Sequence, residues 1–208
     1  STNSAIAAML PRDLQLRVVT NAPDIALLLM AREGIEVSLI GGRLDRRSGG
    51  VLGSQAMECL AGLHVDVCFA GTCAIDSEGT AWAVDGEEAA FKRALVRCAD
   101  RVVVVASNEK LGAIASHRIA SREQVDVLLL EADAPAAQIR ATDAALRAAH
   151  VVAQAAVDRQ RVGGKAQRGE RRVGIVADVI AAAAAIAEEG RAIAIGAAQR
   201  LKLARCVA

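Results

Sequence analysis

The chain has 208 residues, of which 53% are apolar and 24% are charged, and its formal net charge is +1. This apolar content can bury a sizeable core and argues against disorder, while the balanced charge lacks the basic surplus that DNA-binding domains usually carry. One Trp, two Phe and no Tyr argue against a base-stacking surface for single-stranded nucleic acid.

In chain order, short β-branched runs alternate with helix-like stretches. The pattern predicts a helix over 5–10, a strand over 16–20, a helix over 23–31, a strand over 35–40, a helix over 54–61, a strand over 65–70, a helix over 87–99, strands over 102–105 and 125–130, a helix over 135–149 and a strand over 150–153. Such alternation predicts an α/β fold with a parallel sheet that is covered on both faces.

Two of these segments allow finer predictions. Val102–Val105 is all valine, which is typical of a strand buried on both faces. In helix 87–99 the apolar residues share one face, and the basic residues are expected off it. The apolar residues are Ala90, Phe91, Ala94, Leu95 and Cys98, and the basic ones are Lys92, Arg93 and Arg97.

Cysteine and histidine spacing gives no sign of a metal centre or a disulfide framework. The number of cysteines, five, is odd; their spacing is irregular, and the sequence has no CxxC motif. The three histidines lie far apart in the sequence. These residues are Cys59, Cys68, Cys73, Cys98, Cys206, His64, His117 and His150. We therefore expect reduced thiols in a cytoplasmic protein, with no metal and no cofactor.

The N-terminus shows no signal-peptide pattern. The longest apolar run, around Val173–Ala187, includes Asp178 and is shorter than the roughly 20 residues of a membrane span. We expect a buried or interface helix there, and no membrane partner.

In parallel sheets, ligands bind beyond the carboxyl ends of the strands. The predicted strand ends lead into Thr20-Asn21, Gly41-Gly42, Gly71–Asp76 and Ala106–Lys110. Gly41-Gly42 lets backbone approach a ligand or simply forms a tight turn. Lys110 can reach a phosphate as a point charge, or it is a solvated loop lysine.

Capping offers a second explanation for several polar residues. The segment Ser1–Ser4 precedes helix 5–10. Its hydroxyls and the free backbone N–H groups of the helix start could bind an anion. The alternative is a plain N-cap box. Thr20-Asn21 before Pro23 also suits an N-cap. An acidic group lies on the loop that leads into helix 87–99 and in its first turn: Asp76, Asp85, Glu87 and Glu88. The helix dipole stabilises acids there without any function. Alternatively, paired carboxylates accept sugar hydroxyls or do acid–base chemistry.

Several stretches together resemble the C-terminal sensor domain of the DeoR family of bacterial repressors. They are STNSAIAAML (1–10), VVTNAPDIALLL (18–29), VSLIGGRLD (37–45), GVLGSQAMECL (50–60), VDVCFAGTCAIDSEGTAWAVDGEEAAFKRALV (65–96) and VVVVASNEKLG (102–112). The resemblance covers residues 1 to about 157. It implies a Rossmann-like three-layer sandwich with a parallel sheet, shared with ribose-phosphate isomerases, glucosamine-phosphate deaminases and CoA transferases.

The resemblance also implies a phosphorylated sugar, or a similar small metabolite, as the bound effector. The residues carried over from the family are Thr2, Asn3, Thr20, Asn21, Gly41, Gly42, Asp85, Glu88, Lys92 and Lys110. Gly71 and Asp76 join them from the strand-end rule. The implied protein is a transcriptional regulator of sugar metabolism, not an enzyme, and forms homo-oligomers.

Two departures from the family pattern keep alternatives open. Ser107 stands where many members have Asp, and Gly71 and Ala74 replace carboxylates of the related isomerases. Binding is therefore favoured over turnover, although Asp76 keeps a sugar-phosphate isomerase or deaminase open. A nucleotide- or CoA-binding protein ranks last, because no GxGxxG or P-loop occurs.

The C-terminal part departs further from the family order. We expect an effector-sensing domain over 1–157, a basic linker over 158–172 and a helix–strand tail over 173–208, with DNA binding left to a winged helix-turn-helix that this chain does not contain. The linker is flexible or forms a phosphate-contacting arm. Residues 192–196, AIAIG, resemble the family's first strand, so the tail folds back into the sheet or forms a helical appendage for oligomerisation.

Overall fold

A seven-stranded parallel sheet forms the centre of the protein. The computed structural model describes residues 2–10, 14–131, 134–138, 150–154 and 192–195. The strand order is β11-β10-β8-β5-β12-β1-β2, and every pairing in this sheet is parallel. The strands are β1 (Leu16–Thr20), β2 (Ile35–Leu39), β5 (Val65–Gly71), β8 (Ala99–Val105), β10 (Val127–Glu131), β11 (His150–Gln154) and β12 (Ala192–Ile195).

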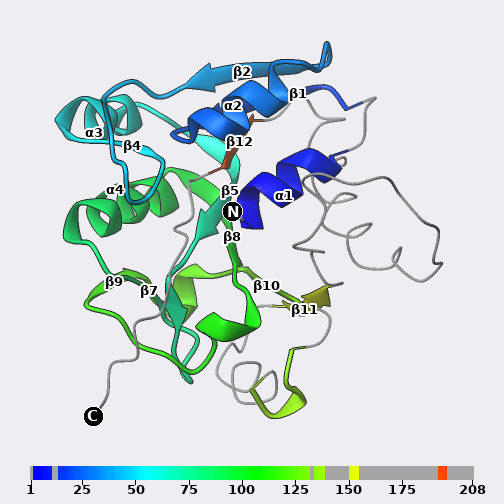
Figure 1. Ribbon diagram of the computed structural model, residues 1–208, viewed down its shortest axis with the longest axis vertical. Coiled ribbons are helices and arrows are strands. Elements are labelled where there is room, and N and C mark those ends of the chain that lie inside the picture. The colour runs from blue at the N-terminus through cyan, green and yellow to red at the C-terminus, as the bar shows by residue number, and fades with distance from the viewer. Residues whose placement is uncertain (1, 11–13, 132–133, 139–149, 155–191, 196–208) are drawn as a thin grey trace.

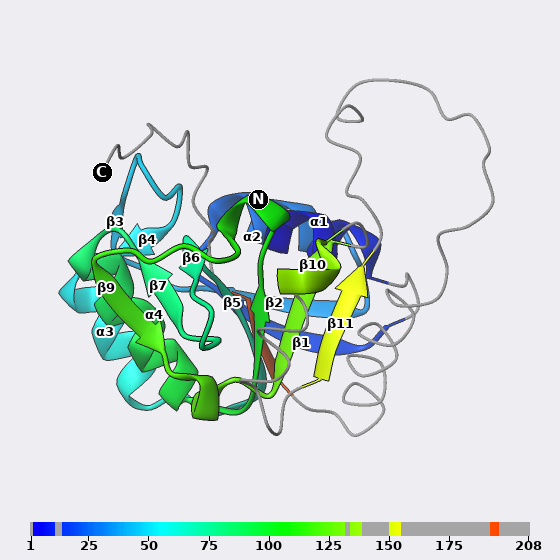
Figure 2. The same ribbon diagram turned by 90° about the horizontal axis from the view of Figure 1, so that it is seen from below.

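Among the described residues, helices α1 to α4 cover the two faces of the sheet (Figures 1 and 2). They are α1 (Thr2–Met9), α2 (Pro23–Leu29), α3 (Ser54–Ala61) and α4 (Gly86–Arg97). Helices α1 and α2 pack into one buried apolar cluster, and α3 and α4 pack into the other. This arrangement confirms the predicted three-layer α/β sandwich.

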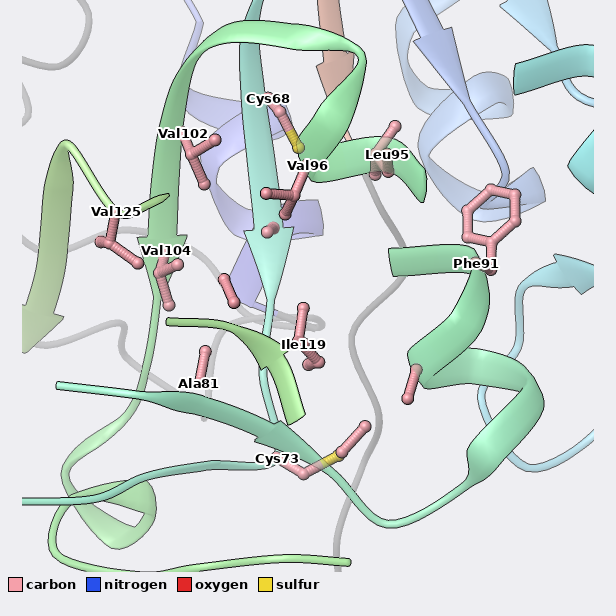
Figure 3. Close-up of a cluster of buried hydrophobic side chains, with 14 of the residues drawn as sticks. Cys68, Cys73, Ala81, Phe91, Leu95, Val96, Val102, Val104, Ile119 and Val125 are labelled. Carbon is pink, nitrogen blue, oxygen red and sulfur yellow. The ribbon is translucent and has the colours of Figure 1, made fainter. Parts of the chain in front are cut away.

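Strand β8 shows why the two clusters form. Val103 and Val105 belong to the α1–α2 cluster, whereas Val102 and Val104 belong to the α3–α4 cluster (Figure 3). Alternate side chains of a strand point to opposite faces, so an all-valine strand buries apolar surface on both. Each fully buried valine contributes about 1.5–3 kcal/mol, and the prediction for this strand is confirmed.

Two small antiparallel sheets extend the fold beyond the ends of the central strands. One joins β3 (Arg43–Leu44) to β4 (Val51–Leu52), and the other joins β6 (Ala74–Ile75), β7 (Ala81–Ala83) and β9 (His117–Ala120). Two 3₁₀ turns, η1 (Asn108–Lys110) and η2 (Arg122–Gln124), complete the loops. The sequence did not predict these strands, because two to four residues are too few to show an alternating pattern.

Strand β12 lies between β1 and β5 (Figure 1). Ala194 is the Cα partner of Val19 on one side and of Cys68 on the other. Residues 192–195 therefore occupy the place that the fold-back hypothesis gives them. The division of the chain at residues 157 and 172 stays a prediction, and residues 155–191 and 196–208 lie outside the described residues.

Most predicted elements are found with small shifts of their ends. Strand 16–20 and helix 54–61 have the predicted bounds. Helix 87–99 is α4 and ends at Arg97, because β8 already begins at Ala99. Strand 125–130 is β10, over 127–131. Of the predicted helix 135–149, residues 136–138 are helical and 139–149 are not described.

Within the described ranges, none of the helices has the length and apolar character needed to cross a membrane.

Candidate functional site

The buried polar residues of the described chain gather beyond the carboxyl ends of the central strands. They are Asn3, Thr20, Asn21, Thr72, Asp76, Glu88, Lys92, Ser107 and Lys110. Seven of the predicted site residues are among them. Of the other predicted residues, Gly71 is buried at the end of β5, Thr2 and Asp85 are half-buried, and Gly41 and Gly42 are exposed.

One row across the sheet connects the start of α1 with the ends of β1 and β5. Thr20 and Phe69 are both Cα partners of Ile195 in strand β12. The side-chain amide of Asn3 donates a 3.0 Å hydrogen bond to the carbonyl oxygen of Phe69. The structure therefore brings the predicted residues Asn3 and Thr20 to the same edge of the sheet.

Thr20 and Asn21 shape the chain after β1. The N-cap of α2 is Ala22, which makes no side-chain cap, so the alternative that Thr20 or Asn21 is the N-cap is wrong. Instead, the Thr20 hydroxyl accepts a 3.1 Å hydrogen bond from the Ala22 amide. The Asn21 side-chain amide donates to the Val51 carbonyl at 3.0 Å, and the Val51 amide donates back to the Asn21 carbonyl at 2.7 Å.

The Gly-Gly turn after β2 has a steric explanation. Gly42 has a φ of 141°, and a Cβ atom there would lie 2.8 Å from the carbonyl oxygen of Leu52. A side chain at this position would both strain the backbone and clash with strand β4. The tight-turn alternative therefore accounts for Gly42.

Asp76 is held entirely within its own hairpin. One carboxylate oxygen accepts hydrogen bonds from the amides of Glu78 and Thr80, each at 2.9 Å. The other accepts a 2.8 Å hydrogen bond from the indole N–H of Trp82. Both oxygens therefore shape the turn between β6 and β7, which leaves little of this carboxylate for acid–base chemistry.

The other acidic residues of the predicted group separate at the start of α4. Asp85 is the N-cap, and its side chain accepts a 2.9 Å hydrogen bond from the Glu88 amide. That bond is the largest cause of the lowered pKa of Asp85, and the nearby Arg47 guanidinium also contributes. Arg47 pairs with Asp85, and Arg43 pairs with Glu87, both at 2.5 Å. These pairs join the β3–β4 hairpin to α4.

Glu88 and Lys92 form a buried ion pair on α4. Lys92 Nζ lies 2.7 Å from Glu88 Oε1, and each side chain is only 3% exposed. Within the described part of the chain, neither charged group has a hydrogen-bond partner beyond this ion pair. The expectation that Lys92 lies off the buried face is wrong. Because Glu88 is one turn earlier, the helix can bury the two opposite charges together.

Lys110 completes this group, which we call the buried charge cluster: Glu88, Lys92 and Lys110. Lys110 is 5% exposed, so the solvated-loop alternative is wrong. Burial is the main cause of its lowered pKa, and the positive charge of Lys92 lowers the pKa further, while Cys73, Glu109 and Glu88 act in the opposite direction. The loop after β8 thus brings a second ammonium group to the Glu88–Lys92 pair.

Thr72 and Ser107 are buried polar residues that the predicted site did not include. The Thr72 hydroxyl lies 2.7 Å from the Ala74 carbonyl oxygen and 2.9 Å from that of Trp82. The Ser107 hydroxyl donates to Glu109 at 3.2 Å. Both lie within the ranges 71–76 and 106–110 that the strand-end rule selected, so the rule reached them, although neither was named as a site residue.

Metal ligands do not come together in the described residues, where no group of three His, Cys, Asp or Glu side chains could hold a metal ion. Among the described residues, Cys59, Cys68, Cys73 and Cys98 form no disulfide. The arrangement at the strand ends is therefore one of buried ammonium groups, amides and hydroxyls. Such groups recognise anions and hydroxylated compounds.

Comparison with known proteins connects this arrangement to a family. The chain is 31% identical over 135 residues to the glycerol-3-phosphate regulon repressor of Escherichia coli K12, covering 65% of this chain and 54% of that protein. It is 33% identical over 131 residues to the HTH-type transcriptional regulator GlpR of Haloferax volcanii, covering 63% and 51%.

A third relative is the HTH-type transcriptional repressor GlcR of Bacillus subtilis 168, at 32% identity over 114 residues, covering 55% of this chain and 44% of that protein. The chain thus spans about half the length of these relatives, whose names describe transcriptional regulators and not enzymes. The family model described as the DeoR C-terminal sensor domain matches residues 1–132. On this match, which covers more than half of the sequence, the chain belongs to the DeoR C-terminal sensor domain family.

Proposed function

We propose that this chain is the effector-binding domain of a DeoR-type repressor of sugar metabolism and that its effector is a phosphorylated sugar or a similar phosphorylated metabolite. The observation that carries the proposal is the buried charge cluster. Within this cluster two buried lysines stand beside one buried carboxylate, and the further carboxylate that acts on Lys110, Glu109, is exposed. A buried ammonium group is stabilised by a compensating anion such as a phosphate.

The surroundings of the cluster suit the rest of such a ligand. Glu88 has a carboxylate oxygen that makes no hydrogen bond within the described residues, and a sugar hydroxyl could donate to it. Lysine recognises phosphate as a point charge. Together these groups favour a compound that carries both a phosphate and hydroxyl groups.

The proposal extends to the whole regulator. The relatives include a glycerol-3-phosphate regulon repressor and proteins named as helix-turn-helix regulators. We infer that DNA binding belongs to a helix-turn-helix domain outside the matched segment, that the regulator acts in the cytoplasm, and that it self-associates. The enzyme alternative is less favoured, since both oxygens of Asp76 are engaged within its hairpin.

A thermal-shift screen tests the proposal. The probes are glycerol 3-phosphate, ribose 5-phosphate and glucose 6-phosphate, each beside its unphosphorylated parent, and inorganic phosphate. We expect stabilisation by one phosphorylated compound, worth about 2.7 kcal/mol at 100 times Kd, without any conversion of that compound.

Two variants make the screen specific. Lys110→Met removes a buried ammonium group with little change in volume and is expected to abolish the shift. Arg101→Met, at an exposed position of the same strand region, is the matched control and is expected to retain it. A phosphorylated compound that is consumed would favour the enzyme alternative, and no shift with any phosphorylated compound would contradict the proposal.

A further inference from the structure

The loop after β8 carries Lys110, and contacts with two other strands give this loop its shape. After Lys110, the amide of Ala113 donates a 3.2 Å hydrogen bond to the carbonyl oxygen of Ile75 in β6. Before Lys110, the amide of Asn108 donates a 2.8 Å hydrogen bond to Oε2 of Glu131 in β10. Lys110 therefore lies between two anchored points of the loop.

Glu131 caps the turn that leads to Lys110. The turn η1 begins at Asn108, and the first N–H groups of such a turn have no partner within it. Its N-cap, Ser107, makes no side-chain cap, since the Ser107 hydroxyl donates to Glu109 at 3.2 Å. The acceptor comes instead from Glu131, 23 residues later in the chain. A half-buried carboxylate is a strong acceptor for a backbone amide.

The turn sets the direction of the Lys110 side chain. Lys110 is the last residue of η1, and its amide donates a 2.9 Å hydrogen bond to the Ser107 carbonyl oxygen. Its side chain is 5% exposed and joins the buried pair of Glu88 and Lys92. Burial of an ammonium group is costly, so a loop that was free to move would release Lys110 into water. An anchor on this loop is therefore needed to keep the lysine inside.

We propose that Glu131 is a positioning residue of the effector site, whose carboxylate holds the η1 turn so that Lys110 stays within the buried charge cluster and meets the phosphate. The contact with phosphate rests on the proposed function, whereas the placement of Lys110 does not. The anchor at Ile75 is made by backbone atoms, so Glu131 is the anchor that a substitution removes directly.

Three variants separate the hydrogen bond of Glu131 from its charge. Glu131→Leu removes the acceptor, whereas Glu131→Gln keeps an acceptor oxygen and loses the negative charge. Asn108→Pro removes the donor, at a first helical position where Pro is favoured. Ser107 has a φ of −82° and a ψ of 159°, which suits a residue before Pro. Glu123→Leu, which removes an exposed carboxylate from the turn before β10, is the matched control.

Acetylation of lysine, followed by peptide mass spectrometry, measures the placement of Lys110. With a small amount of sulfosuccinimidyl acetate, Lys110 is expected to react slowly in the parent protein, in Glu131→Gln and in Glu123→Leu. In Glu131→Leu and Asn108→Pro its rate is expected to rise about tenfold or more, which is the factor that a hydrogen bond to a charged group typically contributes.

Lys92 in the same samples separates local release of the loop from unfolding. It is as buried as Lys110, with a side chain 3% exposed, but it belongs to helix α4. Faster reaction of Lys110 with an unchanged rate at Lys92 supports the proposal. An unchanged rate at Lys110, or equal increases at both lysines, in both Glu131→Leu and Asn108→Pro overturns it. An increase in Glu131→Gln as large as in Glu131→Leu also overturns it, because charge and not the hydrogen bond would then place Lys110.

Titration with the three phosphate esters of the thermal-shift screen tests the consequence for binding. The ester that stabilises the parent protein is expected to bind about tenfold or more weakly to Glu131→Leu and Asn108→Pro, and with retained affinity to Glu131→Gln and Glu123→Leu. Because both changes remove the same bond, the double variant is expected to bind no more weakly than either single variant. A change that only destabilises the fold lowers the Tm without ligand and leaves Kd unchanged.

The positioning and the proposed function fail in different ways. Release of Lys110 together with unchanged affinity overturns the role of Glu131 in binding, while the response of the parent protein to the ester stands. No response of the parent protein to any phosphate ester contradicts the proposed function, and the acetylation rates then still decide whether Glu131 places Lys110.

Discussion

Asp76 and the Glu88–Lys92 pair are both buried and charged, yet the protein treats them differently. Asp76 has both carboxylate oxygens engaged by N–H groups of its own hairpin. The Glu88–Lys92 pair has an ion-pair contact and no further hydrogen-bond partner in the described chain. Burial alone therefore does not mark a binding group. A buried charge whose hydrogen bonds are left open is the better sign of a ligand site.

The comparison predicts the largest loss of stability for Lys92→Met. This change removes the cation that contacts the Glu88 carboxylate directly and leaves only Lys110 of the cluster to balance its charge. Breaking a buried ion pair typically costs about 3–5 kcal/mol. The double variant Glu88→Leu, Lys92→Met replaces the pair with apolar side chains and is expected to recover most of that loss. Urea unfolding measures both. A single variant as stable as the parent protein would show that the pair is solvated.

Asp76→Ala is expected to cost less, roughly 2–4 kcal/mol, because three N–H donors lose a charged acceptor but their hairpin can admit water. Trp82 is the only tryptophan, so its fluorescence reports directly on this hairpin in the same urea experiment. Glu78→Ala, an exposed carboxylate two residues away, is the matched control. Equal stability of the two variants would refute a structural role for Asp76.

The sequence predicted the central sheet and several of the buried polar residues that follow its strands. The all-valine strand and the alternation of strands and helices give the sheet, and the strand-end rule selects Thr20, Asn21 and Lys110 before any contact is known. Burial of Lys92 could not be predicted in the same way. The helical pattern places it beside Arg93, and only its pairing with Glu88 makes burial tolerable.

The short antiparallel strands and the separate roles of the acidic residues also escaped prediction. Asp76, Asp85 and Glu88 look alike in the sequence, yet one holds a hairpin, one caps a helix and one is buried beside a lysine. These roles depend on Trp82, on a helix start and on Lys92. Such partners become visible only when the chain is folded.

A smaller effect is expected for the pH dependence of stability at Lys110. Burial lowers the pKa of Lys110 below its ordinary 10.5. Between the lowered pKa and 10.5, the unfolded chain binds more protons than the folded protein, so the free energy of unfolding rises with pH in this window. At lower pH the buried charge of Lys110 destabilises the parent protein, so we expect Lys110→Met to be more stable than the parent. This difference in the free energy of unfolding is expected to shrink as the pH rises toward 10.5.

Cys68 supplies an opposite trend that is common to both proteins. Burial raises the pKa of its thiol from 9.0 to about 12, so the folded protein keeps a proton that the unfolded chain loses, and stability falls over this range. Urea unfolding of the parent and Lys110→Met at matched pH values cancels this term. A constant difference between the two proteins at alkaline pH would contradict a buried, titrating Lys110.

The smallest effect is expected at the solvent-exposed pairs, which show how little an ion pair is worth without burial. Arg43 and Glu87 are 60% and 48% exposed, and such pairs contribute about 0.2–1 kcal/mol. A double-mutant cycle with Arg43→Ala and Glu87→Ala should give a coupling energy in that range that decreases with added salt. A coupling near that of the Glu88–Lys92 pair would mean that the β3–β4 hairpin shields its ion pairs from water, and the contrast between buried and exposed charges would then no longer single out the buried charge cluster.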